Sequence, residues 1–320
     1  KLRKSGLWTA IRQRPFSTIA NPDDKPRDIY VSAINSAPLS ADFNFICKDQ
    51  VDLLQTGIDA VGKLTEGNVH FNVSTEADRS STFTGLKGVQ LNRFNGPHPV
   101  GNVGVQIHHI RPIDKGDTVW YLDPQALITI GRLFKEGKYD PSRIVALVGS
   151  EVKEPKYFET QIGASLKNML KGQLSEGTNR IISGDVLTGE KIEADGFIGF
   201  YDSEVSVIPE GDEPQFFLTE GWLSPGFSKF SVSRALPSWL MPGKKYRLNT
   251  NKNGEERAFV VTGEMEKVFP FDIYPMQLVK SIMVNDVEMM EKLGIYEVDS
   301  EDFALCEFAC TSKIEIQGNI

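Results

Sequence analysis

Short apolar runs alternate with segments of helical periodicity along the first half of the chain. Runs rich in β-branched and aromatic residues predict strands at residues 28–34, 68–73, 103–110, 118–122 and 143–148. Apolar residues at helical spacing predict helices at residues 51–64 and 124–135, the second of them capped by Asp123, and the opening residues also fit a helix. Strands that alternate with helices in this way predict a Rossmann-like α/β domain over residues 1–149.

The pattern changes after Gly149, where glycine and proline interrupt the chain often. Short β runs are expected at residues 180–182, 197–201, 205–208 and 258–262, with one helical stretch at residues 165–170. These features predict a β-rich, β-grasp-like ligand-binding domain over residues 150–275. From Pro275 the apolar spacing is helical again, which predicts a helical domain over residues 276–320 that includes an acidic helix at residues 302–310.

Composition narrows the class of protein. The chain has 320 residues, 40% hydrophobic and 24% charged, which is typical of globular proteins. Its 35 Lys and Arg against 43 Asp and Glu give a net charge of -8, which disfavours nucleic-acid binding. Three cysteines form no disulfide framework and favour a reducing compartment. We find no signal peptide and no membrane-spanning run, and the start without Met and the abrupt end suggest a longer protein trimmed at both ends.

Charge is distributed unevenly along the chain. The first twenty residues carry a net charge of +5, whereas residues 282–310 contain eight acidic residues and only one basic residue, Lys292. Two solvated faces would explain this pattern. A basic docking or anion-binding surface at the start and an acidic, partner-facing element at the end would explain it equally well.

The sequence lacks the common nucleotide and hydrolase motifs, and its most distinctive loop surrounds His98. There is no G-x-G-x-x-G, G-x-x-x-x-G-K-[ST], H-E-x-x-H or G-x-S-x-G sequence. Prolines on both sides of His98 stiffen a loop that presents an imidazole, either as a ligand or proton-transfer group or as a hydrogen-bonding group of the loop itself. His108 and His109 are expected on a strand, where they would point to opposite faces and could not share a metal.

Cys306 and Cys310 are four residues apart, so in a helix both thiols lie on one face. A zinc or iron–sulfur site needs about four ligands, and the third cysteine, Cys47, is remote in the sequence. Our first interpretation is that the two thiols pack as small hydrophobic groups. Half of a site that a partner completes is the second.

The segment Ser5–Phe16 combines two aromatic residues with two arginines around a proline. Guanidinium groups beside aromatic rings suit a flat ligand with carbonyl oxygens. They equally suit a domain or subunit interface, which composition alone favours.

Several short motifs in one order resemble the A subunit of the Na⁺-translocating NADH:quinone oxidoreductase family. They are Ser5-Gly-Leu-Trp-Thr-Ala10 with Arg14-Pro-Phe16, Gly96-Pro-His-Pro99 with Gly101, Arg180-Ile-Ile-Ser-Gly184, Lys229-Phe-Ser-Val-Ser233, and Asp302-Phe-Ala-Leu-Cys306 with Cys310. The resemblance implies a peripheral subunit on the cytoplasmic face of the bacterial inner membrane. Its complex oxidises NADH, reduces ubiquinone or menaquinone and exports Na⁺, with flavins and iron–sulfur centres on the other subunits.

The resemblance also implies a layout similar to the flavin-binding subunit of respiratory complex I. In that relative a Ser-Gly-Leu sequence leads into a glycine-rich loop around the flavin phosphate, whereas here Ser5-Gly6-Leu7 is followed by bulky residues. The relative also has a four-cysteine iron–sulfur site where this chain has only Cys306 and Cys310. Both departures imply a fold that is kept while its cofactors are lost, so we expect no catalytic residue, metal or cofactor in this chain.

The family has been associated with quinone binding by this subunit. The candidate residues here are Trp8, Ile11, Arg12, Arg14, Pro15 and Phe16, with His98 as a hydrogen-bond partner. The competing interpretation is that this segment only docks other subunits and that the chain serves assembly alone. Two less favoured alternatives are a stand-alone flavin enzyme and a metal-dependent hydrolase that uses His98 with His108 or His109.

Overall fold

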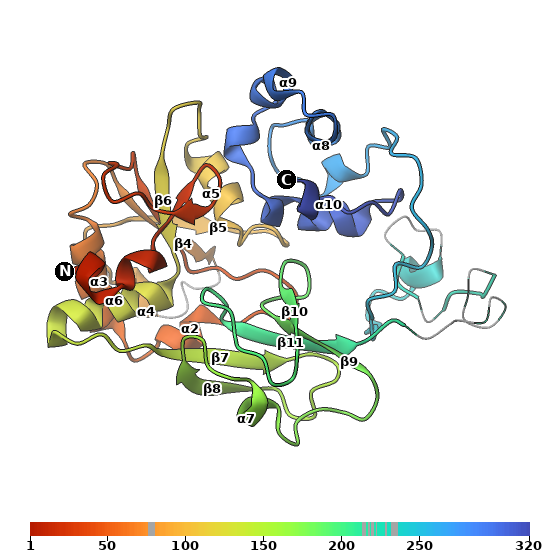
Figure 1. Ribbon diagram of the computed structural model, residues 1–320, viewed down its shortest axis with the longest axis horizontal. Helices are drawn as coiled ribbons and strands as arrows, with labels where there is room; N and C mark the ends of the chain where they lie inside the picture. Colours follow the sequence, from red (N-terminus) through yellow and green to blue (C-terminus); the bar gives the residue numbers. More distant parts are fainter. Residues whose placement is uncertain are drawn as a thin grey trace.

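A computed structural model describes residues 1–75, 81–212, 216, 218, 221, 223–227, 229–231 and 236–320. These parts of the chain have a mixed α/β arrangement of two β-sheets and a group of short helices (Figure 1). The family motif at residues 229–233 lies partly outside the described residues, at positions 232 and 233.

The first sheet has six strands in the order β2-β1-β6-β3-β4-β5. The strands are β1 (Arg12–Arg14), β2 (Thr18–Ile19), β3 (Ile29–Ser32), β4 (Val69–Ser74), β5 (Gln90–Phe94) and β6 (Val119–Leu122). Strands β6, β3, β4 and β5 run parallel, whereas β1 and β2 are antiparallel to their neighbours. After β3 the chain adds β4 and then β5 on one side of β3, and it then returns to add β6 on the other side. The strand order therefore reverses between β3 and β6.

Helices cover both faces of this sheet. On β3, Ile29 and Val31 belong to one hydrophobic core, and Tyr30 between them belongs to another. The helices of this region are α1 (Leu2–Ser5), α2 (Phe43–Cys47), α3 (Val51–Val61), α4 (Ser81–Thr84), α5 (Val103–Ile110) and α6 (Pro124–Glu136). The predicted cap of α6 is confirmed, because the Asp123 carboxylate accepts a hydrogen bond of 2.8 Å from the backbone N–H of Ala126.

Helices α3 and α6 cross very closely because each has a glycine at the contact. A Cβ atom on Gly57 would lie 2.3 Å from the carbonyl oxygen of Leu127, and one on Gly131 would lie 2.0 Å from that of Leu53. Only a residue without a side chain fits at either position.

The strand predicted at residues 103–110 is wrong, since these residues form the helix α5. Val103, Ile107 and Ile110 are spaced for one helical face, and all three contribute to the core that contains Tyr30. The Gln106 side chain donates hydrogen bonds to Ser32 Oγ and to the carbonyl oxygens of Val100 and Gly101. A short run with glycine and two histidines fits both periodicities, and these tertiary contacts select the helix.

The second sheet has five strands in the order β10-β9-β11-β7-β8. The strands are β7 (Ser142–Val148), β8 (Lys156–Gln161), β9 (Asn179–Ser183), β10 (Glu190–Ile192) and β11 (Glu204–Pro209), and the helix α7 (Lys167–Leu170) packs nearby. The apolar run at residues 143–148 is a strand as predicted. It belongs to this second sheet, parallel to β11, and not to the first α/β layer where we placed it.

Two further predicted strands are wrong. Residues 197–201 form no strand, since Phe197 makes only an isolated bridge to Ser165, and Phe200 and Tyr201 lie in a turn. Residues 258–262 pair with no strand among the described residues, and Val260 and Val261 are exposed. A β-branched run gives a strand only where a neighbouring edge pairs with it over several residues, and among the described residues neither run has such a neighbour.

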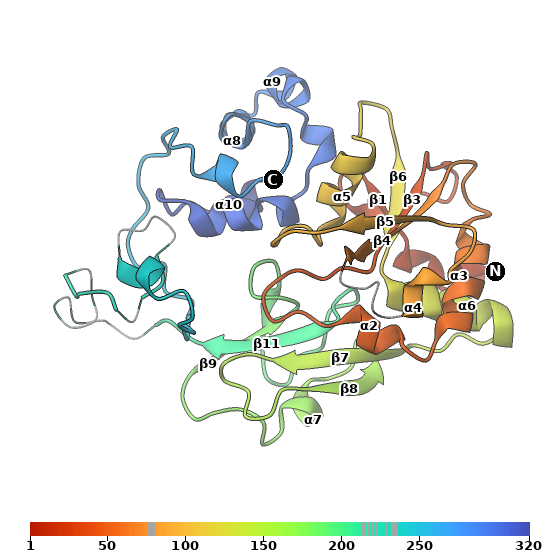
Figure 2. The same ribbon diagram turned by 180° about the vertical axis from the view of Figure 1, so that it is seen from behind.

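The last part of the chain is helical, as predicted. It contains α8 (Pro275–Met283), α9 (Val287–Lys292) and α10 (Ala304–Ala309), and α10 continues a 3-10 turn at Ser300–Phe303. These helices surround their own hydrophobic core, and in both ribbon views they lie beside α5 of the first region (Figures 1 and 2). Among the described residues, no helix is both long enough and apolar enough to cross a bilayer.

Candidate functional site

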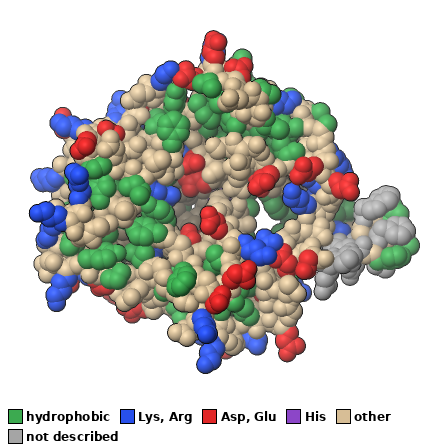
Figure 3. Space-filling model, viewed as in Figure 1, with side chains coloured by type: hydrophobic (Ala, Val, Ile, Leu, Met, Phe, Trp, Pro, Cys, Tyr) green, Lys and Arg blue, Asp and Glu red, His purple; other side chains and the backbone are tan. Residues whose placement is uncertain are grey.

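A cavity of about 220 Å³ lies where three regions of the chain meet. They are the first region, which contains the six-stranded sheet, the second region, which contains the five-stranded sheet, and the helical region that begins at α8. The first sheet contributes residues at the carboxyl ends of β3 and β6, which is the point where its strand order reverses. In open α/β sheets ligands bind at such a point. The second region contributes Gly184, Asp185 and residues 201–204, and the helical region contributes Glu301. Figure 3 shows a hollow near the middle of the face that it draws, with both acidic and basic side chains around it.

Arg12 is the cation of this cavity and is held between two aromatic rings. Its guanidinium carbon lies 4.6 Å from the ring centre of Tyr121 and 4.4 Å from that of Tyr201. The Tyr201 hydroxyl donates a hydrogen bond of 2.8 Å to the carbonyl oxygen of Thr9, which fixes this ring. Within the part of the chain that the structure describes, no oxygen accepts a hydrogen bond from the Arg12 guanidinium. The side chain is therefore oriented but keeps its donors for a ligand.

His98 lines the same cavity. Its Nδ1 lies 3.0 Å from Ser36 Oγ, which also accepts a hydrogen bond of 2.8 Å from the backbone N–H of Gly101. The other ring nitrogen, Nε2, is buried and has no hydrogen-bond partner among the described residues. Burial lowers the pKa of His98 and outweighs the opposing effect of Asp185 and Glu301, so the imidazole is neutral at pH 7.

The opposite wall of the cavity is acidic. Burial raises the pKa of Glu204 to about 7, although its hydrogen bonds from the Ala41 N–H and the Asn35 side chain favour the charged form. Burial likewise raises the pKa of Asp202, whose carboxylate accepts a hydrogen bond of 2.5 Å from Ser183 Oγ. A carboxyl group with a pKa near 7 can hold or release a proton close to physiological pH.

Arg14 lies close to Arg12 in sequence but has a different role. It is fully buried and pairs with Asp302, at 2.7 Å, and with Glu301. Burial alone would lower the pKa of Arg14, but these two carboxylates raise it overall. The arginine therefore joins the first sheet to the helical region, and its charge is already neutralised within the fold.

The other candidate residues of the segment Ser5–Phe16 lie in different places. Ile11 is buried in the main core, and Phe16 is exposed and makes a T-shaped ring contact with Tyr296. Pro15 lies between Arg14 and Phe16 and does not line the cavity. Of the seven candidates, the structure thus brings only Arg12 and His98 together in the cavity.

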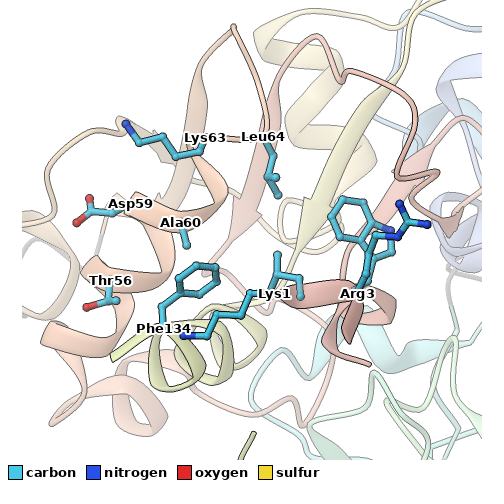
Figure 4. Close-up of a pocket in the computed structure, with 10 residues that line it drawn as sticks. Lys1, Arg3, Thr56, Asp59, Ala60, Lys63, Leu64 and Phe134 are labelled. Atoms are coloured by element: carbon cyan, nitrogen blue, oxygen red, sulfur yellow. The ribbon is translucent and has the colours of Figure 1, made fainter. Parts of the chain in front are cut away.

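Trp8 lies in a separate groove of about 520 Å³ beside the start of the chain (Figure 4). Leu2, Leu64 and Phe134 form apolar walls with Trp8, and the Lys1 ammonium lies 5.1 Å from the Phe134 ring centre. The Trp8 indole N–H donates a hydrogen bond of 2.7 Å to the carbonyl oxygen of Ala20. Its polar atom is used within the fold, so only the apolar surface of the ring faces the groove.

His108 and His109 lie on α5, so our prediction of opposite strand faces is wrong. His108 Nδ1 lies 2.7 Å from Glu297, and its Nε2 accepts a hydrogen bond of 3.1 Å from the backbone N–H of Asp272. His109 Nδ1 lies 2.9 Å from the carbonyl oxygen of Val105. Neither residue lines the cavity that contains His98. No group of three His, Cys, Asp or Glu side chains suited to a metal occurs among the described residues.

Cys306 and Cys310 lie in the apolar core of the helical region, among residues such as Phe269 and Phe303. Burial raises the pKa of Cys306 to about 12, so this thiol stays protonated. The arrangement agrees with our first interpretation of the pair as small hydrophobic groups.

The segment that would cradle a flavin phosphate uses its backbone amides internally. Helix α1 and the 3-10 turn Leu7–Ala10 occupy this position. The N–H groups of Ser5, Gly6 and Ile11 donate to the carbonyl oxygens of Lys1, Arg3 and Trp8. A phosphate cradle needs several free amides that point at one position, and these residues do not fit that requirement.

Two features of the cavity were missed by our sequence analysis. Tyr121 and Tyr201 hold Arg12, and Glu204 supplies the carboxyl group with the raised pKa. Tyr121 stands at the carboxyl end of a predicted strand, so its place at the functional edge of the sheet was a usable signal. Tyr201 and Glu204 reach the cavity only because the second sheet packs against the first region. The local sequence pattern does not predict this packing.

Comparison with known proteins assigns the chain to a family. Residues 1–139 match the family model described as the NqrA second alpha/beta domain, and residues 144–194 match the model described as the NQRA C-terminal domain. The chain is 40% identical over 313 residues to the A subunit of the Na(+)-translocating NADH-quinone reductase of Rhodopirellula baltica, which covers 97% of this chain and 67% of that protein. The chain belongs to the NqrA family.

Other members of the NqrA family are similarly close. The protein of Yersinia pestis bv. Antiqua is 40% identical over 98% of this chain and 69% of its own length, and that of Cellvibrio japonicus is 41% identical over the same shares. Among solved structures, an NAD+-reducing [NiFe]-hydrogenase matches at 13% identity and a TM-score of 0.41 in its H2-reduced state. The match covers 58% of this chain and 41% of that one. A likeness this weak carries no argument about function.

Proposed function

We propose that this chain is a peripheral subunit of the Na⁺-translocating NADH:quinone reductase that serves assembly and binds a quinone head group in the cavity around Arg12. It binds no flavin, metal or iron–sulfur centre of its own, and electrons pass through cofactors on the partner subunits. Its place is the cytoplasmic face of the bacterial inner membrane. The names of its relatives and the internally bonded segment 5–11 support this proposal.

The architecture proposed for this role has three parts. We propose a Rossmann-like domain within residues 1–149, a β-grasp-like domain over residues 150–275 that also takes in the preceding strand β7, and a helical domain over residues 276–320. The parallel strands with helices on both faces support the first part. The small sheet with one short helix, α7, supports the second.

One observation carries the quinone proposal. The cavity contains two oriented hydrogen-bond donors, on Arg12 and His98, that have no acceptor among the described residues. Arg12 is held between two tyrosine rings, and His98 Nε2 is buried without a partner among the described residues. If Ser36 donates its hydroxyl hydrogen to Nδ1, the neutral ring carries its proton on Nε2 and becomes a donor. A quinone ring has one carbonyl oxygen at each end, so the two donors would bind it from two sides. The aromatic face of Tyr121 or Tyr201 would contact the ring.

Calorimetric titration of the full chain with a short-chain ubiquinone tests this proposal. We expect saturable binding that Arg12→Ala and His98→Ala each weaken by roughly 10-fold or more, because each removes a hydrogen bond to a desolvated carbonyl oxygen. Arg111→Ala, at an exposed arginine outside the cavity, is the matched control and should bind normally. No saturable binding, or equal binding by all variants, would reject the quinone site and favour a pure docking module.

A further inference from the structure

An arm of unusual composition leaves the second sheet after β11. Residues 221–254 contain no Asp or Glu, although the whole chain has a net charge of -8. The same stretch contains six basic residues, Lys229, Arg234, Lys244, Lys245, Arg247 and Lys252. It also contains two of the four tryptophans of the chain. We call its described residues 223–227, 229–231 and 236–248 the basic arm.

The basic arm projects from the rest of the molecule. In both ribbon views it extends sideways beyond the ends of β9 and β11 (Figures 1 and 2). Large apolar side chains on it are exposed to solvent, with exposed fractions of 60% for Phe227, 56% for Trp239 and 62% for Leu240. Soluble surfaces rarely expose several large apolar residues together unless they bind a partner or a membrane.

Hydrogen bonds within the arm fix how these side chains are presented. Ser238 is buried, and its hydroxyl accepts a hydrogen bond of 3.1 Å from the backbone N–H of Ser231. Ser238 belongs to the 3-10 turn Pro237–Leu240, so Trp239 and Leu240 are adjacent at the exposed side of this turn. The Lys244 ammonium donates to the carbonyl oxygen of Phe227 and thereby ties the two sides of the arm together.

The base of the arm is anchored to the folded body. Arg247 binds the buried carboxylate of Glu151 through two hydrogen bonds of 2.6 and 2.7 Å. Phe230 stacks against Phe308 of the helical region, with ring centres 6.3 Å apart. The arm is therefore held at the segment after β7 and at α10, while Trp239 and Leu240 are exposed to solvent.

We infer that the basic arm binds the anionic surface of a lipid bilayer, with Trp239 and Leu240 entering the interfacial region and Lys244 and Lys245 contacting lipid phosphates. Segments that bind at the membrane–water interface combine tryptophan, leucine and phenylalanine with lysine, and this arm has that composition and no acidic residue. Both lysines are exposed and lie within a few residues of the apolar pair. The inference agrees with a place in a membrane complex, but it depends neither on quinone binding nor on the partner subunits.

Vesicle co-sedimentation of the full chain tests the inference without any other subunit. We expect binding to vesicles of equimolar phosphatidylcholine and phosphatidylglycerol, little binding to pure phosphatidylcholine, and loss of binding at high salt. The double variant Lys244→Gln, Lys245→Gln should bind roughly 25-fold more weakly, since each basic residue near an anionic surface contributes about fivefold. Trp239→Ser with Leu240→Ser should weaken binding at least about tenfold, because two apolar side chains no longer enter the interface.

Two matched double variants serve as controls. Lys153→Gln with Lys171→Gln removes two exposed lysines from the second region, and Met283→Ser with Val284→Ser removes two exposed apolar residues near α8. Both should bind vesicles as the unmodified chain does. The inference is overturned if the arm variants and these controls bind equally, or if the chain prefers neither type of vesicle. Arm variants that keep vesicle binding and lose only copurification with other subunits would also overturn it, and would instead identify an acidic protein partner.

Discussion

Arg14 and Asp302 form a buried ion pair with a distance of 2.7 Å, although 288 positions separate them in the sequence. Both side chains are completely inaccessible to solvent. Gly104 on α5 makes room for the pair, because a Cβ there would lie 2.6 Å from the Asp302 carboxylate. Three segments, namely β1, α5 and the 3-10 turn Ser300–Phe303, thus meet at one charge pair. The first and the last of them belong to opposite ends of the chain.

Loss of Arg14 should destabilise the fold strongly. Arg14→Met leaves the Asp302 carboxylate buried without its partner, so we expect the free energy of unfolding to fall by about 3–5 kcal/mol. Urea denaturation measures this change. The double variant Arg14→Met, Asp302→Leu should recover most of the loss, because no unpaired charge remains buried. A double variant no more stable than the single one would show that the hydrogen bonds of the pair, and not its charge balance, stabilise this contact.

The stability of the protein should depend on pH through Glu204. Its pKa is about 7 in the folded protein against 4.5 when unperturbed. Between these values the folded state keeps a proton that the unfolded state has lost, so the free energy of unfolding falls as pH rises through this range. The full effect is at most roughly 3 kcal/mol.

The variant Glu204→Gln isolates this contribution. Glutamine keeps a polar side chain at the site but does not titrate, so the variant should be more stable than the unmodified chain at pH 8 and nearly equal to it at pH 5. Denaturation at both pH values gives the comparison. Parallel stability curves for the two proteins between pH 5 and 8 would mean that Glu204 has an ordinary pKa in the folded state.

Gly131→Ala should destabilise the protein, although alanine is usually favoured over glycine within helices by roughly 1 kcal/mol. The added Cβ would lie 2.0 Å from the Leu53 carbonyl oxygen, so α3 and α6 would have to separate. We expect a lower melting temperature for this variant. Gly85→Ala, where a Cβ meets no atom within 4 Å, is the control and should melt at the same temperature as the unmodified chain or slightly higher.

The cysteines should resist thiol reagents in the native protein. Cys47, Cys306 and Cys310 are all buried, and burial raises the pKa of both Cys47 and Cys306. Since the thiolate is the reactive form, modification should require unfolding. Counting modified thiols by mass spectrometry with and without denaturant checks this. Rapid labelling of Cys306 in the native protein would show that the helical core opens readily.

Sequence periodicity predicted those elements whose environment repeats along the chain. The strands near Tyr30 and Phe71 are buried on both faces because helices cover both sides of the sheet, and the cap at Asp123 is a purely local arrangement. The segment Val103–Ile110 was assigned wrongly because its short run fits two periodicities, and contacts with Ser32 and Tyr30 decide between them.

The site was only partly accessible to sequence reasoning. A cation beside aromatic residues suggested a ligand for both Arg12 and Arg14, which have the same side chain and lie two positions apart in β1. Residues two positions apart on a strand share a face, so periodicity cannot distinguish them. They differ in function because Arg12 meets Tyr201, while Arg14 meets Asp302. The identity of these partners depends on long-range packing and leaves no mark in the local sequence.

The composite origin of the cavity has a consequence for how the chain works inside a larger assembly. Arg12 and His98 come from the first region, Tyr201 and Glu204 from the second and Glu301 from the third. A fragment that ends before the second sheet would keep both donors but lose the Tyr201 ring that helps to orient Arg12 and the whole acidic wall. Occupancy of this cavity can therefore serve as a readout of complete chain assembly, since a ligand that needs all of its walls binds only after the three regions have packed together.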